Sequence, residues 1–135
     1  MIFVDTSAFL AIENRRDKYY RNAVTLRDTL LKTGKILVTS DYILDESYTV
    51  IRFRAGHHIA VQFGEAVRGS RFLRVEYIAP DLIEKAWELF RTFSDHEFSF
   101  TDCTSFILME RLKIKTAFTF DAHFKEYGKF NISPS

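Results

Sequence analysis

Short apolar runs alternate along the chain with longer segments in which apolar residues recur at helical spacing. The run 2–4 (IFV) is hydrophobic on both faces, which is typical of a buried parallel strand. Residues 35–39 (KILVT) and 116–120 (TAFTF) predict two more strands, and 72–78 predicts another because its apolar residues alternate. Residues 131–133 predict a short fifth strand.

The segments between these strands predict helices. Candidate caps precede three of them: Thr6 or Ser7, then Ser40 or Asp41, and finally Thr101. The expected helices cover 8–13, 18–33, 41–55, 57–68, 81–94 and 101–112. Strands that alternate with helices indicate an α/β fold of three layers with a mainly parallel central sheet. The length of 135 residues fits a single domain over 1–135.

Composition narrows the class of protein. Hydrophobic residues make up 47% of the chain, which excludes a disordered protein. The single cysteine, Cys103, excludes an intramolecular disulfide and a cysteine-rich zinc site, and we expect it to be an inert buried thiol in a reducing compartment. The N-terminus is a poor signal peptide and no apolar run reaches the ~18 residues of a membrane span, so we expect a cytoplasmic protein with no membrane partner.

Two of the predicted strands end in aspartate. Asp5 follows the first strand and Asp121 follows the strand at 116–120. In parallel sheets the working site lies beyond the carboxyl ends of the strands, so the two acids are expected near each other. Each also has an ordinary interpretation as a turn residue at a strand end.

Two further acids are predicted on inward helix faces. Glu46 lies four residues from both Tyr42 and Val50, which belong to the apolar stripe of its helix. Asp102 lies four residues before Phe106 and shares its face. Taken singly, Glu46 also fits an ion pair, and Asp102 fits an acid that favours a helix N-terminus.

Together the four acids suggest a metal centre, because no basic residue is predicted on the same faces. Carboxylates crowded into one cleft repel one another unless cations enter. Oxygen ligands without His or Cys select Mg²⁺, with Mn²⁺ as the second choice. Such a cluster holds one or two ions, about 4 Å apart, in enzymes that activate water for displacement at phosphorus.

The same positions resemble a known family. The chain has Val4-Asp5-Thr6-Ser7 at its start, Glu46 after the second strand, Thr101-Asp102-Cys103 opening a late helix, and Phe120-Asp121-Ala122-His123-Phe124 after the last major strand. This order resembles the PIN-domain ribonucleases, and the length and the Asp-X-His-Phe ending are most similar to the VapC toxins of toxin–antitoxin pairs. The resemblance covers essentially the whole chain.

The resemblance implies a metal-dependent endoribonuclease that leaves a 3′-hydroxyl and a 5′-phosphate. Asp5 and Asp102 would be the principal Mg²⁺ ligands, and Glu46 and Asp121 would complete the catalytic site. The resemblance also implies that neighbouring hydroxyl groups orient these acids, namely those of Thr6, Ser7 and Thr101. The implied partners are an RNA substrate, a VapB-like antitoxin and a second copy of the chain in a homodimer, with DNA reached only through the antitoxin. The antitoxin is expected to insert an Arg or Lys among the acids and to anchor apolar residues in a groove near 10–55.

Basic residues gather in the middle of the chain. The overall net charge is only +1, so any nucleic-acid site is a local patch. Phosphates would be drawn to the candidate RNA-binding residues Arg52, Arg54, Arg68 and Arg71, which also fit a solvated surface. The histidines are expected to have no ligand role: His57 and His58 point about 100° apart on a helix with no acid near them, and His123 is predicted to be structural.

Three other functions stay open at this point. A PIN-domain ribonuclease without an antitoxin fits the same acids, as does a non-catalytic module whose acidic cleft docks a basic partner. A phosphoacceptor or phosphohydrolase domain fits less well. Asp5 has no neighbouring acid, and Ser7 stands where a phosphatase of the haloacid dehalogenase type has its second aspartate. Metal-dependent RNA cleavage separates the enzyme from the binding module.

Overall fold

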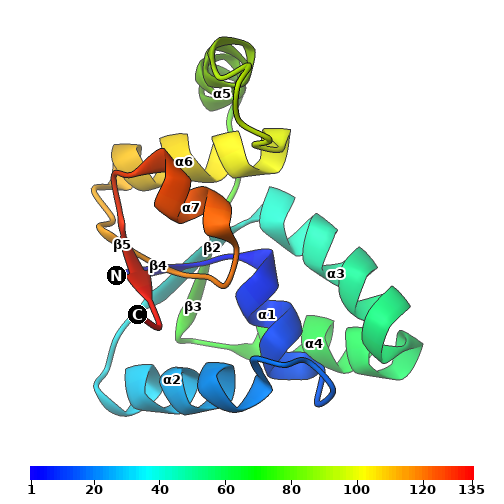
Figure 1. The fold of residues 1–135 in the computed structure, drawn as a ribbon. Helices are drawn as coiled ribbons and strands as arrows, with labels where there is room; N and C mark the ends of the chain where they lie inside the picture. Colours follow the sequence, from blue (N-terminus) through cyan, green and yellow to red (C-terminus); the bar gives the residue numbers. More distant parts are fainter.

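The predicted alternation of strands and helices is present in the computed structural model, which describes residues 1–135. Five strands and seven helices follow one another along the chain (Figure 1). In chain order they are β1 (Ile2–Val4), α1 (Thr6–Glu13), α2 (Tyr20–Lys32), β2 (Leu37–Ser40), α3 (Asp41–Ala55), α4 (His57–Gly69), β3 (Leu73–Glu76), α5 (Pro80–Thr92), α6 (Phe100–Leu112), β4 (Thr116–Phe118), α7 (Ala122–Tyr127) and β5 (Asn131–Ser133).

The five strands form one parallel sheet in the order β3-β2-β1-β4-β5. The first strand is therefore central, between β2 and β4. In the register of β1 with β4, Val4 pairs with Phe118, so the two strands end at the same level. This places the residues that follow them, Asp5 and Thr119, side by side at the carboxyl edge of the sheet.

Helices cover the sheet on both sides, as Figure 1 shows: α6 and α7 lie above it, with α5 packed on α6, and α2 and α4 lie below it. The three-layer α/β prediction is confirmed. A parallel sheet needs this cover because its crossover connections place helices on its faces. None of the helices has both the length and the apolar character required to cross a bilayer.

Aromatic packing fixes the helices that carry the late acids. The Phe106 ring on α6 meets the Phe124 ring of α7 edge to face, with centroids 5.0 Å apart, and stacks on Tyr127 at 4.3 Å. Phe124 in turn lies 6.3 Å from the Phe3 ring of β1. The three phenylalanines are fully buried, so α6 and α7 are held against the central strand through the core.

Several predicted details are wrong. The six-residue helix α7 was not expected, because it is too short for a periodic apolar pattern. Asp5, not Thr6 or Ser7, caps α1, and Ser99, not Thr101, caps α6, so both helices begin earlier than predicted. Ser40 caps α3 as one of the two predicted candidates. Strands β3 and β4 both end two residues before the predicted position.

Candidate active site

Asp5 lies at the centre of the sheet's carboxyl edge, between the end of β1 and the start of α1. Its backbone N–H donates to the Phe118 carbonyl at 3.1 Å, which continues the ladder between β1 and β4 by one residue. Its side chain accepts a hydrogen bond from the Ser7 N–H as the cap of α1. Only 3% of the residue is exposed, so its carboxyl group is fixed by strand, helix and core together.

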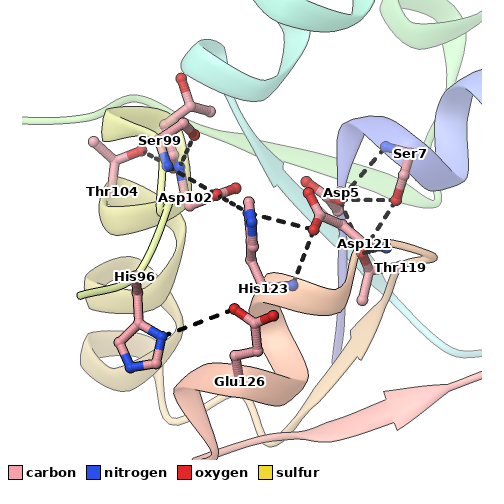
Figure 2. Close-up of polar contacts among 11 residues, drawn as sticks. Asp5, Ser7, His96, Ser99, Asp102, Thr104, Thr119, Asp121, His123 and Glu126 are labelled. Carbon is pink, nitrogen blue, oxygen red and sulfur yellow. Dashed lines mark hydrogen bonds and ion pairs between the residues drawn. The ribbon is translucent and has the colours of Figure 1, made fainter. Parts of the chain in front are cut away.

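Two hydroxyl groups hold one oxygen of this carboxyl group. Ser7 Oγ and Thr119 Oγ1 each donate to Asp5 Oδ2 at 2.9 Å (Figure 2). The same hydroxyls accept backbone hydrogen bonds, Ser7 from Phe120 N–H and Thr119 from Asp121 N–H. Their protons are thereby directed at Asp5, and the turn that carries Asp121 is tied to the same network.

Asp102 is placed by a capping box at the start of α6. The Ser99 hydroxyl accepts from the Asp102 N–H at 2.9 Å, and the Ser99 N–H donates to Asp102 Oδ2 at 3.0 Å. The same Oδ2 lies 2.7 Å from Nδ1 of His123. Asp102 is buried, as its predicted position on an inward face requires.

Asp121 joins this group from the first turn of α7. Its Oδ1 accepts from the His123 backbone N–H at 2.9 Å and lies 3.4 Å from His123 Nδ1. One ligand atom from each of Asp102, Asp121 and His123 falls within 4.8 Å of the others. Figure 2 shows the Asp5 side chain directed toward Asp121 from the opposite side.

Each of the three aspartates keeps one carboxylate oxygen free of protein contacts. These are Oδ1 of Asp5, Oδ1 of Asp102 and Oδ2 of Asp121, since every hydrogen bond to the three side chains goes to the other oxygen. None of them is a fully buried, unpaired atom, because Ser105 Oγ is the sole atom of that kind. The free oxygens therefore reach solvent and can bind a cation or orient water.

Burial and mutual repulsion raise the pKa values of the two buried acids. The pKa of Asp5 rises from 3.8 to about 7, mainly because the carboxyl group is buried, and the charges of Asp102 and Asp121 add to the rise. The hydroxyls of Ser7 and Thr119 oppose it. Burial also raises the pKa of Asp102, although the Ser99 N–H and His123 stabilise its ionised form.

His123 carries the positive charge nearest to the acids. Burial lowers its pKa, but the hydrogen bond to Asp102 and the charges of Asp121 and Asp102 outweigh that effect and raise it. The expectation that no basic group lies beside the acids is therefore wrong at this residue. The His123 ring joins Asp102 on α6 to Asp121 at the start of its own helix, which fits the structural role predicted for it.

The donor set fits a hard divalent cation. Three carboxylate oxygens at one edge of the sheet make no hydrogen bond within the chain, and the acids repel one another without a cation. His123 Nδ1 is occupied by Asp102, so the aspartates supply most of the available ligand atoms, and these are oxygens. The acidic cluster is thus a metal-binding centre by its chemistry.

Glu46 is placed differently from the prediction. It is exposed on α3, whose buried residues are Ile43, Leu44, Ser47 and Ile51. The inward face is thus centred one residue further along than the stripe through Tyr42 and Val50, which are half-buried. Glu46 makes no ion pair or hydrogen bond through its side chain and lies outside the compact Asp102-Asp121-His123 group, so its catalytic role stays a prediction.

Two of the three predicted orienting hydroxyls do not contact an acid. Thr6 Oγ1 donates to the Ile43 carbonyl at 3.5 Å and accepts from Ser47, so it fastens α1 to α3. Thr101 takes part through its carbonyl, which accepts from the Thr104 hydroxyl. Ser7 alone of the three contacts an aspartate, because it shares the cap of α1 with Asp5.

The four candidate RNA-binding arginines do not form one patch. Arg52 and Arg68 line a hollow between α3 and α4, where Arg68 donates to the Tyr48 hydroxyl and the Gly64 carbonyl. Arg54 faces a different hollow, and Arg71 lies over the Phe72 ring. Their role in RNA binding stays a prediction, and the structure divides them between separate surfaces.

Sequence reasoning missed Thr119 and assigned His123 no chemical role. The only sequence feature that indicates a role for Thr119 is its position two residues before Asp121, at the end of a strand. The contact of Thr119 with Asp5 depends on pairing between strands that are distant in the sequence. The Asp-X-His-Phe sequence was the available signal for His123. Cys103 is buried as predicted, and burial raises the pKa of its thiol to about 11, so it is inert.

Comparison with known proteins agrees with this geometry. The PIN domain model matches residues 2–130. The chain is 37% identical over 134 residues to the 23S rRNA-specific endonuclease VapC20 of Mycobacterium tuberculosis, with 99% of each chain covered. It is 28% identical over 124 residues to a VapC ribonuclease of Archaeoglobus fulgidus, covering 90% of this chain and 77% of the relative.

A solved structure shares the whole fold. The crystal structure of M. tuberculosis VapC20, described as a sarcin–ricin loop cleaving toxin, superposes with a TM-score of 0.88 at 35% identity, covering 99% of this chain and 100% of that one. Family and fold agree over nearly the whole chain. The chain belongs to the PIN-domain family and is an endoribonuclease of the VapC toxin type.

Proposed function

We propose that this enzyme is a Mg²⁺-dependent toxin that cleaves the sarcin–ricin loop of 23S rRNA and is silenced by a VapB-like antitoxin. The observation that supports the proposal most is the set of three aspartates at the sheet edge, each with one carboxylate oxygen that makes no hydrogen bond within the chain. The substrate is inferred from the relative that shares 37% identity over nearly all of both chains. Mn²⁺ is the alternative metal, because it accepts the same oxygen ligands.

The principal ligands would be Asp5 and Asp102, with Glu46 reaching the centre directly or through water. A divalent ion held there supplies positive charge to the phosphoryl oxygens and lowers the pKa of water. Ser7 and Thr119 fix one oxygen of Asp5, which leaves the other aimed at the ligand. Ser99 and His123 fix Oδ2 of Asp102, which leaves its Oδ1 for the ion. Asp121 Oδ2 makes no protein hydrogen bond and is the acceptor we assign to the proton of the attacking water. Because no protein nucleophile is used, the products would be a 3′-hydroxyl and a 5′-phosphate.

The antitoxin is proposed to cover both the acids and an apolar groove. A hollow of about 240 Å³ opens between α1, α2 and α4 and is lined mainly by apolar residues, among them Phe9, Ile12, Leu31, Phe63 and Val67. An antitoxin segment with apolar anchors there and an Arg or Lys at the acids would replace the metal charge with a fixed cation. Purified complex should lack RNase activity, and proteolysis of the antitoxin should restore it.

A homodimer is proposed on a different surface. Trp87 and Phe90 of α5 are stacked with centroids 5.9 Å apart, and both are exposed, at 48% and 40%. Exposed aromatic pairs of this kind are typical of interfaces. Light scattering on the free protein tests the dimer, and Trp87→Glu should convert it to a monomer while leaving the acidic centre intact.

The substrate is tested with RNA hairpins. The parent protein should cut a hairpin with the sarcin–ricin loop sequence of 23S rRNA at one position in Mg²⁺, and it should leave a hairpin with the same stem and a scrambled loop intact. Equal cleavage of both hairpins would contradict the proposed substrate. If the protein cleaves no RNA at all, the conclusion that it is an endoribonuclease is wrong.

A further inference from the structure

On the side of the loop between α1 and α2, one hollow adjoins the acidic centre through Ser7 and Phe120, and a second hollow adjoins the first. Each has a volume of about 440 Å³, and they share Asn14, Arg16 and Arg54 in their linings. One of them also includes Ser7, whose hydroxyl holds Asp5. A continuous surface therefore leads from Ser7, which contacts Asp5, to a group of basic side chains, Arg15, Arg16, Lys18 and Arg54, which we call the basic arm.

The helices explain why the basic arm lies beside the acids. Helix α1 begins at its cap Asp5 and ends at Asn14, so its two ends are about 12 Å apart at 1.5 Å per residue. On α3, Glu46 and Arg54 are eight residues apart and share one face. Asp5 thus lies at the start of α1, and the basic arm lies about 12 Å away, where α1 and α3 end.

The loop that carries Arg16 and Lys18 is fixed by its own side chains. Asn14 Oδ1 accepts from the Arg16 N–H at 3.2 Å, and Asp17 Oδ1 accepts from the Tyr19 N–H at 2.8 Å. The Lys18 ammonium group lies 4.9 Å from the centre of the Tyr19 ring. The basic side chains are therefore presented from an ordered turn.

The basic arm is not neutralised within the chain. Arg15, Arg16 and Arg54 are exposed and form no ion pair, whereas the arginines at 27, 74, 91 and 111 are each paired with an acid. The two acids nearby do not cancel the charge. The four cations of the basic arm outnumber the two carboxyl groups in the same linings, those of Glu13 and Asp17.

An aromatic step connects the basic arm to the acids. The rings of Tyr19 and Phe120 are stacked with centroids 4.5 Å apart and planes 9° from parallel, and both residues are half-buried. Phe120 directly precedes Asp121. Proteins that hold unpaired nucleotides combine a basic groove for the backbone with aromatic rings for the bases. Both features are present here in a single surface.

We propose that the basic arm, with the Tyr19–Phe120 step, binds the RNA strand next to the phosphate that is cut. Arg16, Lys18 and Arg54 contact the phosphate backbone, and the aromatic step supports an unstacked base. The inference rests on the proposed function and adds a substrate-binding surface to it. Arg54 keeps its predicted RNA role, and Arg16 and Lys18 join it in place of Arg52, Arg68 and Arg71.

The test compares two variants of equal charge. Arg16→Ala/Arg54→Ala removes two exposed members of the basic arm, and Arg74→Ala/Arg111→Ala removes two surface arginines that are paired with Glu76 and Asp81. Binding of the sarcin–ricin hairpin is measured by fluorescence anisotropy at several salt concentrations, with Asp102→Asn added to every protein so that the RNA stays intact. Thermal unfolding checks that all variants fold.

The basic-arm variant should bind the sarcin–ricin hairpin about 25-fold more weakly than the parent at 0.1 M salt. The slope of log K against log salt should also be less steep by about 1.4, because each of the two lost phosphate contacts to a single strand contributes about 0.7. The control variant should change the affinity less than twofold. With Asp102 restored, cleavage by the basic-arm variant should show a higher KM and an unchanged kcat.

Equal affinities and slopes in the two variants would overturn the proposal, as would a parent protein that binds no RNA. If the parent cleaves RNA normally and only antitoxin binding is lost in the basic-arm variant, the arm is a protein contact and the proposal is wrong. If the protein without the Asp102→Asn substitution binds the hairpin and leaves it uncut, that result would contradict the proposed substrate. The comparison of affinities would still decide whether the basic arm binds RNA.

Discussion

Replacing Asp5 with asparagine should stabilise the metal-free protein at neutral pH. Burial raises the pKa of Asp5 from 3.8 to about 7, so above pH 7 the folded state must ionise a group that it disfavours. Each pKa unit corresponds to about 1.4 kcal/mol. Ionisation of Asp5 therefore lowers the free energy of unfolding by up to ~4 kcal/mol.

The sign of the effect follows from linkage. Below pH 4, Asp5 is protonated in both the folded and the unfolded protein and contributes no difference. As the pH rises from about 4 to about 7, the unfolded state releases this proton while the folded state keeps it, so stability is lost over that range and levels off above pH 7. Asparagine does not titrate, and its side-chain oxygen can still accept hydrogen bonds from the Ser7 and Thr119 hydroxyls. Asp5→Asn should therefore not lose stability as the pH rises.

The assay is urea unfolding of the parent and Asp5→Asn at pH 4 and pH 8 in EDTA. The stability of Asp5→Asn relative to the parent should increase by ~2–4 kcal/mol between the two pH values. The matched control, Asp45→Asn, alters an exposed aspartate on α3 and should show no such change. In Mg²⁺ the parent should gain more stability than Asp5→Asn, because an ion that binds the native state stabilises it. A difference that is independent of pH would refute the reasoning.

Three further predictions concern the residues around the acids. His123→Ala should lower cleavage about 10–100-fold because Asp102 loses the ring that orients it, whereas the exposed His57→Ala should have no effect in the same cleavage assay. Thr119→Val should raise the pKa of Asp5 further and weaken Mg²⁺ binding in calorimetry, since the Thr119 hydroxyl stabilises the ionised carboxyl group. Cys103 should resist Ellman's reagent at pH 8 in the native protein and react after denaturation, because its thiol is buried and its pKa is raised to about 11.

The sequence predicted the layers of the fold because its signals were local. Short apolar strands and capped helices are visible in one window of the chain, and the parallel sheet follows from their alternation. The same reasoning placed Asp5 and Asp121 at the carboxyl edge. It failed at α7, whose six residues are too few to show a helical period.

The contacts within the site depend on pairing between distant segments. Thr119 reaches Asp5 only because β4 lies beside β1, and His123 reaches Asp102 only because α7 packs on α6. Glu46 shows how sensitive a helical face is to phase: a shift of one residue, or about 100°, moved it from the predicted inward stripe to the exposed flank. Residue spacing alone could not fix that rotation.

The most direct test of the central claim is cleavage of the sarcin–ricin hairpin by the parent and by Asp102→Asn as Mg²⁺ is titrated into metal-free protein. The account predicts cleavage by the parent that rises with Mg²⁺ and disappears in EDTA. Asp102→Asn, which keeps its fold through the Ser99 cap, should be slower by about 100-fold or more. Cleavage by the parent that is unaffected by EDTA, or equal rates in the two proteins, would contradict the claim that the three aspartates form a metal-dependent active site.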